Sequence, residues 1–328
     1  MKARKKPRGT KARVQAFKKR LAYVSTAITI AILVATVAFS SFLIYYYLDP
    51  SPNHAINLDQ TNNQPSQPTA AIVDHLSLTW PNQTFTQTAT NTMKEAGYTV
   101  DYYPGEEVNV ELYRNLPTHG YGLIILRVHS TATEIEGPQL VRGPVTLFTS
   151  EPYSKTKYVP EQLTNQLQMA VYSREDLERG ITYFCIRPPF VTNSMIGRFQ
   201  NTIIIMMGCE GLDNTLMAKA FVEKGAKVYI SWNHKVSASH TDLATTHLLQ
   251  HFLVEELTLK EAVRETFKEV GFDPTFKSRL IYYPSEVGSQ TIEDIAGDRR
   301  TNMQSQQEHN KGIICLNFRR PLLIRHMT

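Results

Sequence analysis

One uncharged stretch, Leu21–Leu48, constrains this chain of 328 residues more than any other feature. As a helix, its 28 residues would extend about 42 Å, which exceeds the ~30 Å hydrocarbon core of a bilayer. Tyr23 lies at one end and Tyr45, Tyr46 and Tyr47 at the other, where interfacial aromatic residues are expected. The sequence therefore predicts one transmembrane helix at residues 21–48.

Basic residues flank this stretch on one side only. The first 20 residues hold ten Lys and Arg and no acid, whereas the rest of the chain holds 25 Lys and Arg against 30 Asp and Glu. Because Lys and Arg accumulate on the cytoplasmic side, residues 1–20 are expected in the cytoplasm and the C-terminal domain outside it. The net charge of +5 comes from the arm, so no nucleic-acid partner is expected.

A cleavable signal peptide is the alternative interpretation of this N-terminus. Its apolar core would be about 7 to 15 residues long and would precede a small-residue cleavage site. The stretch here is longer and ends in a Tyr-Tyr-Tyr-Leu-Asp-Pro sequence, which favours an anchor that stays attached.

Residues 49–69 are rich in Pro, Asn, Gln and Ser and predict a flexible stalk. Beyond it, the sequon Asn82-Gln83-Thr84 could carry a glycan.

Residues 70–328 alternate apolar runs with amphipathic stretches. This pattern predicts one α/β domain of the doubly wound type, a mostly parallel sheet with helices on both faces. Strands are expected at 71–76, 98–103, 122–128, 182–186, 202–207, 227–232, 280–283 and 312–317. Helices are expected at 85–96, 108–115, 161–169, 214–224, 239–256 and 259–270, and a hairpin-like segment at 133–158.

Two predicted strands end in residues suited to nucleophilic chemistry. His129 follows the strand at 122–128, and Cys209 follows the strand at 202–207. Ligands of open α/β sheets bind at the carboxyl ends of the strands, so both side chains are expected at one site. A thiolate is the attacking species, and a nearby imidazole can take up the thiol proton.

The residues around this pair favour the same chemistry. A helix is expected within about five residues of Cys209, and its partial positive charge would favour the thiolate. Main-chain N–H groups of Ser130, Gly208 and Cys209 are candidates for an oxyanion hole. A histidine after a strand is by itself more often structural, so the hypothesis depends on its pairing with the cysteine.

The order of these motifs resembles that of clan CD cysteine peptidases. Their caspase-hemoglobinase fold is shared by caspases, clostripain, gingipains, separase and CHAT domains, and His129 and Cys209 match the family's catalytic positions. The resemblance spans residues 71–283 and is greatest to CHAT domains and clostripain-like peptidases. It rests on Cys209 to Gly211, the helix ending Ala218-Lys219-Ala220-Phe221-Val222-Glu223-Lys224-Gly225-Ala226, Ser231-Trp232, and Leu259-Lys260-Glu261-Ala262-Val263.

Two positions depart from the family pattern. Ser130 stands where the family usually has Gly after the histidine, which keeps the N–H but changes the packing of substrate. Gly208 stands before the cysteine, where the family often has a small or acidic residue, so no acidic specificity residue carries over. Glu210 and Asp213 could recognise a basic substrate side chain, although surface carboxylates without such a role are more common.

The end of the strand at 227–232 offers further substrate-binding candidates. Ser231, Trp232 and Asn233 lie at the same edge of the sheet and could line a specificity pocket. Alternatively, Trp232 packs in the hydrophobic core and does not line a pocket.

Histidines elsewhere raise the question of a metal site. His240, His247 and His251 lie on one face of the helix expected at 239–256, and the last two could chelate an ion. Leu248, Leu249 and Gln250 stand between them, so the H-E-x-x-H pattern of metallopeptidases is absent. We expect a partly solvated helix face, with neither a metal nor another cofactor.

Two functions are compatible with the sequence. The first is a membrane-anchored cysteine endopeptidase that hydrolyses peptide or protein substrates. The second is a non-catalytic ectodomain of the same fold that binds peptides or proteins in the same groove. The three cysteines, Cys185, Cys209 and Cys315, leave at least one thiol free, although buried cysteines without a role are common.

Overall fold

The computed structural model describes residues 67–135 and 141–297. The predicted arm at 1–20, the predicted membrane segment at 21–48, most of the predicted stalk and the predicted strand at 312–317 lie outside the described residues. Within the described ranges, no helix has the length and apolar character needed to cross a membrane.

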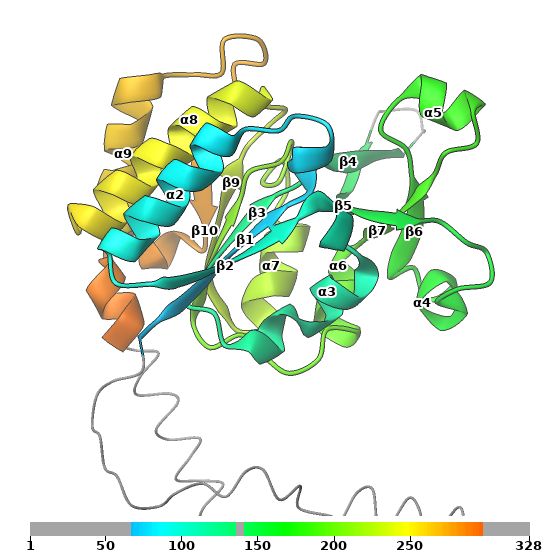
Figure 1. The fold of residues 1–328 in the computed structure, drawn as a ribbon, viewed down its shortest axis with the longest axis horizontal. Coiled ribbons are helices and arrows are strands. Elements are labelled where there is room, and N and C mark those ends of the chain that lie inside the picture. The colour runs from blue at the N-terminus through cyan, green and yellow to red at the C-terminus, as the bar shows by residue number, and fades with distance from the viewer. Residues whose placement is uncertain (1–66, 136–140, 298–328) are drawn as a thin grey trace, which may run out of the picture. The chain divides into compact units, whose positions relative to one another are not determined.

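A six-stranded sheet forms the centre of the described part (Figure 1). Its order is β10-β9-β8-β3-β1-β2, and all pairings are parallel except that of β10 with β9. The strands are β1 (Thr69–Asp74), β2 (Thr99–Pro104), β3 (Leu123–Arg127), β8 (Thr202–Met206), β9 (Ala226–Trp232) and β10 (Leu280–Tyr283). The predicted α/β class with a mostly parallel sheet is confirmed.

Helices cover both faces of this sheet, as expected for parallel strands whose central residues are apolar and buried. One face packs against α2 (Gln83–Glu95), α8 (Ala238–Leu249) and α9 (Leu259–Val270). The other face packs against α3 (Val110–Asn115), α6 (Pro188–Asn193) and α7 (Leu216–Glu223). Side chains of β3 alternate between the faces, with Leu123 and Ile125 on the α2 side and Ile124 and Leu126 on the α7 side.

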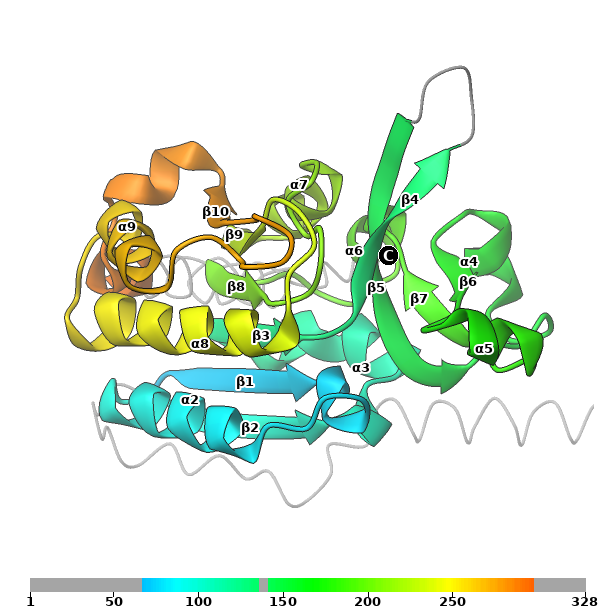
Figure 2. The ribbon, with the colours of Figure 1, turned by 90° about the horizontal axis from the view of Figure 1, so that it is seen from above.

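A second sheet of four antiparallel strands was not predicted as a sheet, although the predicted hairpin-like segment at 133–158 and the predicted strand at 182–186 overlap with it. Its order is β4-β5-β7-β6, and Figure 2 shows it beside the main sheet, with β4 and β5 forming a long hairpin. The elements are β4 (Ser130–Ile135), β5 (Val141–Pro152), α4 (Val159–Leu163), β6 (Leu167–Ala170), α5 (Arg174–Glu178) and β7 (Tyr183–Ile186). Leu147 and Phe184 pack into the core on the α7 side, so the two sheets share one apolar cluster.

Two helix predictions need correction. The helix expected at 161–169 is wrong because α4 ends at Leu163 and a strand begins at Leu167. Asn165 lies between them with a φ of +62°, a left-handed conformation that Asn tolerates and a helix does not. The helix expected at 239–256 is divided, since α8 ends at Leu249 and continues as a π-helical turn, Gln250–Val254.

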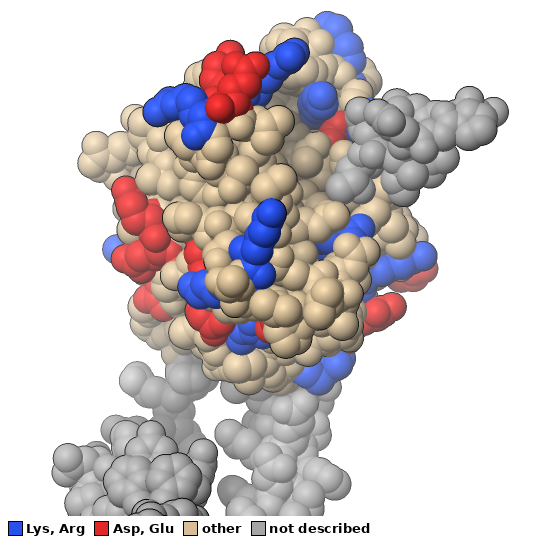
Figure 3. All heavy atoms as spheres, turned by 90° about the vertical axis from the view of Figure 1, so that its right-hand side faces the viewer, with Lys and Arg blue, Asp and Glu red and all other residues tan. Residues whose placement is uncertain are grey.

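Charged side chains of both signs are interspersed on the face that carries the second sheet. Figure 3 shows Lys and Arg next to Asp and Glu over the described part of this face. Such mixing is typical of a solvated protein surface.

Candidate active site

Strands β3 and β8 bring His129 and Cys209 to equivalent positions at the carboxyl edge of the sheet. The two strands pair in parallel, with Leu126 opposite Met206. The N–H of Met207 donates to the carbonyl of Leu126 at 2.9 Å, which continues the pairing beyond β8. His129 and Cys209 each lie three residues after the Leu126–Met206 pair, so the parallel pairing places both residues at the same edge of the sheet.

Ser130 joins the two strand ends directly. Its Oγ donates to the carbonyl oxygen of Cys209 at 2.5 Å. A Cβ on Gly208 would lie 2.3 Å from both Ser130 Oγ and the carbonyl oxygen of Val128. Only glycine allows the chain to come this close, so the residue before the candidate nucleophile is constrained by its backbone surroundings.

The thiol and the imidazole have different hydrogen-bond partners in this conformation. Cys209 Sγ donates to the carbonyl oxygen of Val236 at 3.5 Å. His129 Nε2 lies 2.9 Å from Thr79 Oγ1. Among the described residues no hydrogen bond joins the two side chains. The strands therefore supply the neighbouring positions, and side-chain rotation would have to complete a dyad.

Aromatic rings surround His129, and the sequence did not single them out. The ring centroids of His75, Phe148 and Tyr172 lie 5.6, 6.2 and 5.3 Å from that of His129. Burial, together with the nearby Arg127 charge, lowers the pKa of His129 to about 4. The imidazole is therefore neutral at pH 7 and can accept a proton.

His75 is a second buried imidazole at this edge. Its Nε2 lies 2.6 Å from the hydroxyl of Tyr172, which in turn donates to the carbonyl oxygen of Thr149. Because Tyr172 uses its proton for Thr149, it accepts from His75 Nε2–H. His75 Nδ1 has no hydrogen-bond partner among the described residues. Burial, and then the proximity of His129, lower the pKa of His75 to about 3.

Burial has the opposite effect on the thiol. It raises the pKa of Cys209 above the ordinary value, and the hydrogen bond to Val236 offsets this only in part. The expected helix does not begin until Leu216, and the thiol bonds to Val236 instead of to that helix. At pH 7 both partners are neutral, so His129 could act as the base only when the thiol attacks.

Two of the predicted oxyanion donors, Gly208 and Ser130, have described neighbours. The N–H of Gly208 donates to Met206 Sδ at 3.0 Å. A thioether is a weak acceptor, so a substrate oxygen could take its place. Ser130 is the first residue of β4 and pairs with Leu147 of β5.

Glu210, a predicted substrate-binding residue, is bound within the chain. Its carboxylate accepts from the N–H of Ala132 at 2.8 Å and from Arg142 Nη1 at 2.5 Å, and Asp213 Oδ1 lies 3.8 Å from the same nitrogen. Burial alone would raise the pKa of Glu210, but the Ala132 N–H and Arg142 outweigh it and lower the pKa. The acidic pair expected to recognise a basic substrate side chain thus holds Arg142.

The predicted pocket residues at the end of β9 lie mostly in the core. Ser231 Oγ donates to the carbonyl oxygen of Met206 at 2.6 Å, and Trp232 Nε1 donates to Thr241 Oγ1 at 2.8 Å. Both residues are buried, so Trp232 fits the core interpretation. Asn233 is exposed, and its side-chain oxygen accepts from the N–H of Arg279.

A buried ion network lies beside the site. Arg127, fully buried at the end of β3, donates to Asp74 at 2.7 Å and to both oxygens of Asp242 at 2.8 and 2.9 Å. Asn82 of the sequon caps α2 through the Phe85 N–H and donates its side-chain amide to Asp242 at 2.8 Å. The sequon asparagine therefore has a structural role in this network.

The helical histidines divide into two groups. His247 and His251 come together with Glu269 of α9, and their ligand atoms lie within 4.8 Å of one another. His240 lies apart from this group, with its ring centroid 5.3 Å from that of Trp232.

A comparison with protein-family models and a search of curated proteins each find no match for this chain. The fold and the candidate site therefore define only a class: an α/β protein whose central strands end in a histidine and a cysteine.

Proposed function

We propose that this chain is a membrane-anchored cysteine endopeptidase of the caspase-hemoglobinase fold. Cys209 attacks the scissile carbonyl carbon, and His129 takes the thiol proton and gives it to the leaving amine. One observation carries the proposal. His129 and Cys209 occupy equivalent positions after adjacent parallel strands, and Ser130 ties the two strand ends together through its bond to Cys209.

The connections of the sheet support this location. The chain forms β1, moves outward to β2, and then crosses to β3 on the other side of β1. The strand order therefore reverses between β1 and β3, and in open α/β sheets ligands bind in the crevice at such a point. His75 follows β1 and His129 follows β3 at this reversal.

Completing the dyad requires two side-chain movements. The thiol must leave the carbonyl oxygen of Val236, and the imidazole must leave the hydroxyl of Thr79. A neutral hydrogen bond contributes about 0.5–1.5 kcal/mol net, so contacts with a bound substrate can replace both. Catalytic hydrogen bonds often tighten only when substrate is bound.

The predicted anchor gives the enzyme a location. A stalk of about 20 residues has a random-coil reach of roughly 25 Å. The substrates are accordingly peptides or proteins exposed at the outer membrane surface.

Peptide cleavage tests the proposal. The full-length chain in detergent is incubated with a mixed peptide library, and the products are identified by mass spectrometry. The wild type and the Cys185→Ala variant should cleave, because Cys185 is a buried thiol whose pKa burial raises to about 11. The Cys209→Ala variant should not cleave. Undiminished cleavage by Cys209→Ala, or none by the wild type, contradicts the proposal.

A second candidate function is a non-catalytic ectodomain that binds peptides. The separate partners of the thiol and the imidazole, Val236 and Thr79, favour it. Under this alternative the wild type would bind library peptides without cleaving them, and Cys209→Ala would bind them equally well.

A further inference from the structure

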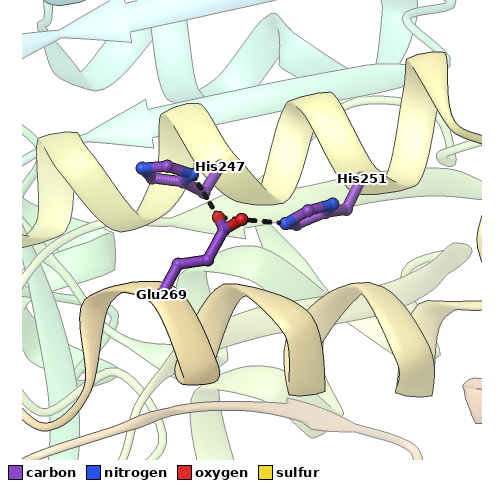
Figure 4. A group of neighbouring side chains, drawn as sticks. All are labelled: His247, His251 and Glu269. Carbon is purple, nitrogen blue, oxygen red and sulfur yellow. Dashed lines mark hydrogen bonds and ion pairs between the residues drawn. The ribbon is translucent and has the colours of Figure 1, made fainter.

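We propose that His247, His251 and Glu269 bind one divalent transition-metal ion between α8 and α9, and that Zn²⁺ fits the site best. Figure 4 shows the carboxylate of Glu269 between the two imidazoles, with interactions drawn to both. The inference is independent of the proposed peptidase activity.

The spacing of the ligand atoms suits a small ion. Zn–N and Zn–O bonds of about 2.0–2.1 Å at tetrahedral angles place ligand atoms about 3.3–3.4 Å apart. His251 Nε2 lies 3.1 Å from Glu269 Oε2, and His247 Nδ1 contacts the same oxygen. All three ligand atoms lie within 4.8 Å of one another, so small side-chain adjustments would admit the ion.

A second carboxylate orients one of the histidines. His251 Nδ1 lies 2.8 Å from Glu255 Oε2, which leaves Nε2 directed at Glu269. Histidines that bind metals almost always donate their other ring N–H to a carboxylate or a carbonyl, which fixes the tautomer and the ring orientation. The hydrogen bond to Glu255 would fix the tautomer and the ring orientation of His251 in the same way.

The backbone contributes to the arrangement. His247 lies in the last turn of α8, whereas His251 lies in the π-helical turn that follows it. Single π-helical turns within α-helices occur frequently at functional sites. Glu269 comes from the end of α9, which packs against α8.

Access and donor type indicate the class of ion. The side chains of His247 and Glu269 are 36% and 45% exposed, so an ion can enter from solvent and keep water as a fourth ligand. Two imidazole nitrogens and one carboxylate suit Zn²⁺, whereas Mg²⁺ and Ca²⁺ prefer oxygen donors.

Such an ion would fasten α8 to α9. The same helix α8 supplies Asp242 to the buried network of Arg127 and Thr241 to Trp232. Metal binding would therefore stabilise a helix that holds the end of β3 and the end of β9.

Zinc titration of the full-length chain tests the inference. The protein is freed of metal by chelation in detergent and titrated with Zn²⁺, and bound metal is counted by mass spectrometry. The wild type should bind one ion per chain. Glu255→Gln should weaken binding by about 10- to 100-fold, and His247→Ala and Glu269→Gln by at least as much. His119→Ala removes an exposed histidine outside the cluster and should bind as the wild type does.

Cobalt substitution separates this site from one that involves a thiol. Co²⁺ bound by two nitrogens and a carboxylate gives visible bands without a thiolate-to-metal charge-transfer band, and circular dichroism checks that each variant is folded. Zinc binding that is absent in the wild type, or unchanged in folded His247→Ala and Glu269→Gln, overturns the inference. A thiolate band abolished by Cys209→Ala overturns it too.

Discussion

Ser130 Oγ donates a hydrogen bond of 2.5 Å to the carbonyl oxygen of Cys209. The residue after the candidate base is thereby attached to the candidate nucleophile. The sequence indicated Ser130 as a candidate oxyanion donor and as a departure from the glycine of the clan CD pattern. In the structure it is a tie between the ends of β3 and β8.

Removing the hydrogen bond between Ser130 and Cys209 should lower the stability of the protein. Ser130→Ala loses one buried hydrogen bond, so the free energy of unfolding should fall by about 0.5–1.5 kcal/mol. The melting temperature should fall by about 2–4 °C per kcal/mol for a domain of this size. Thermal unfolding followed by circular dichroism measures the change. Thr84→Ala, at an exposed position of α2, is the control, and an equal melting temperature for both variants would disprove the tie.

Stability should depend on pH through the two buried imidazoles. The folded-state pKa values of His75 and His129 are about 3 and about 4, below the ordinary 6.5. Between about pH 4 and 6.5 the unfolded chain binds more protons than the folded chain, so stability is full above this window and is lost as the pH falls through it. Urea unfolding at several pH values measures the slope.

Substituting one histidine tests whether the buried imidazoles cause this dependence of stability on pH. His75→Gln should flatten the dependence by about 1.4 kcal/mol per pH unit within the window, because one titrating group is removed. His119→Gln, at an exposed site, should leave the slope unchanged. The assignment fails if His75→Gln keeps the wild-type slope.

The buried network of Arg127 should be costly to break. Asp242→Ala leaves a fully buried guanidinium without one of its two carboxylates, which should lower the free energy of unfolding by about 3–5 kcal/mol. Chemical denaturation measures the loss. Glu265→Gln removes the partly exposed partner of the exposed Lys268 and should change the denaturation midpoint little. Similar midpoints for the two variants would show that the network contributes no special stability.

Arg142 should compete with basic substrate side chains for the acidic pair. Arg142→Gln vacates Glu210 and Asp213, so peptides with Arg or Lys should bind more tightly than to the wild type. Glu210→Gln should weaken that binding and lower the free energy of unfolding by about 1.5–3 kcal/mol, since charge-assisted hydrogen bonds are lost. Fluorescence titration with matched basic and neutral peptides measures both effects. Unchanged selectivity in Arg142→Gln would assign the pair a purely structural role.

Local patterns were sufficient to predict the strands of the main sheet and most of its helices, whereas α6 (Pro188–Asn193) was not predicted. The strands β3 and β8 are buried at every position, and each contains a continuous apolar run, 123–126 in β3 and 203–206 in β8. Helix α9 occurs at the predicted residues because Thr258 and Glu261 form a capping box at its start and Gly271 follows its end.

Long-range contacts explain what the sequence did not reveal. His75 and Tyr172 are 97 residues apart in the chain, and neither has a local motif that marks it as a neighbour of His129. The second sheet was not recognised as a unit because only two residues separate β4 from β3, and because β6 has only four residues. Glu269 meets His251 only through the packing of α9 on α8, so the histidine spacing showed two ligands and not the third.

Covalent labelling tests the central claim most directly. The full-length chain is treated at pH 7 with a peptide that carries a thiol-reactive group in place of the scissile bond, and peptide mapping locates the adduct. We expect one adduct on Cys209, retained in Cys185→Ala, lost in Cys209→Ala and strongly reduced in His129→Ala. Equal labelling of wild type and Cys209→Ala, or labelling of Cys209 that is independent of His129, would contradict a catalytic pair of Cys209 and His129.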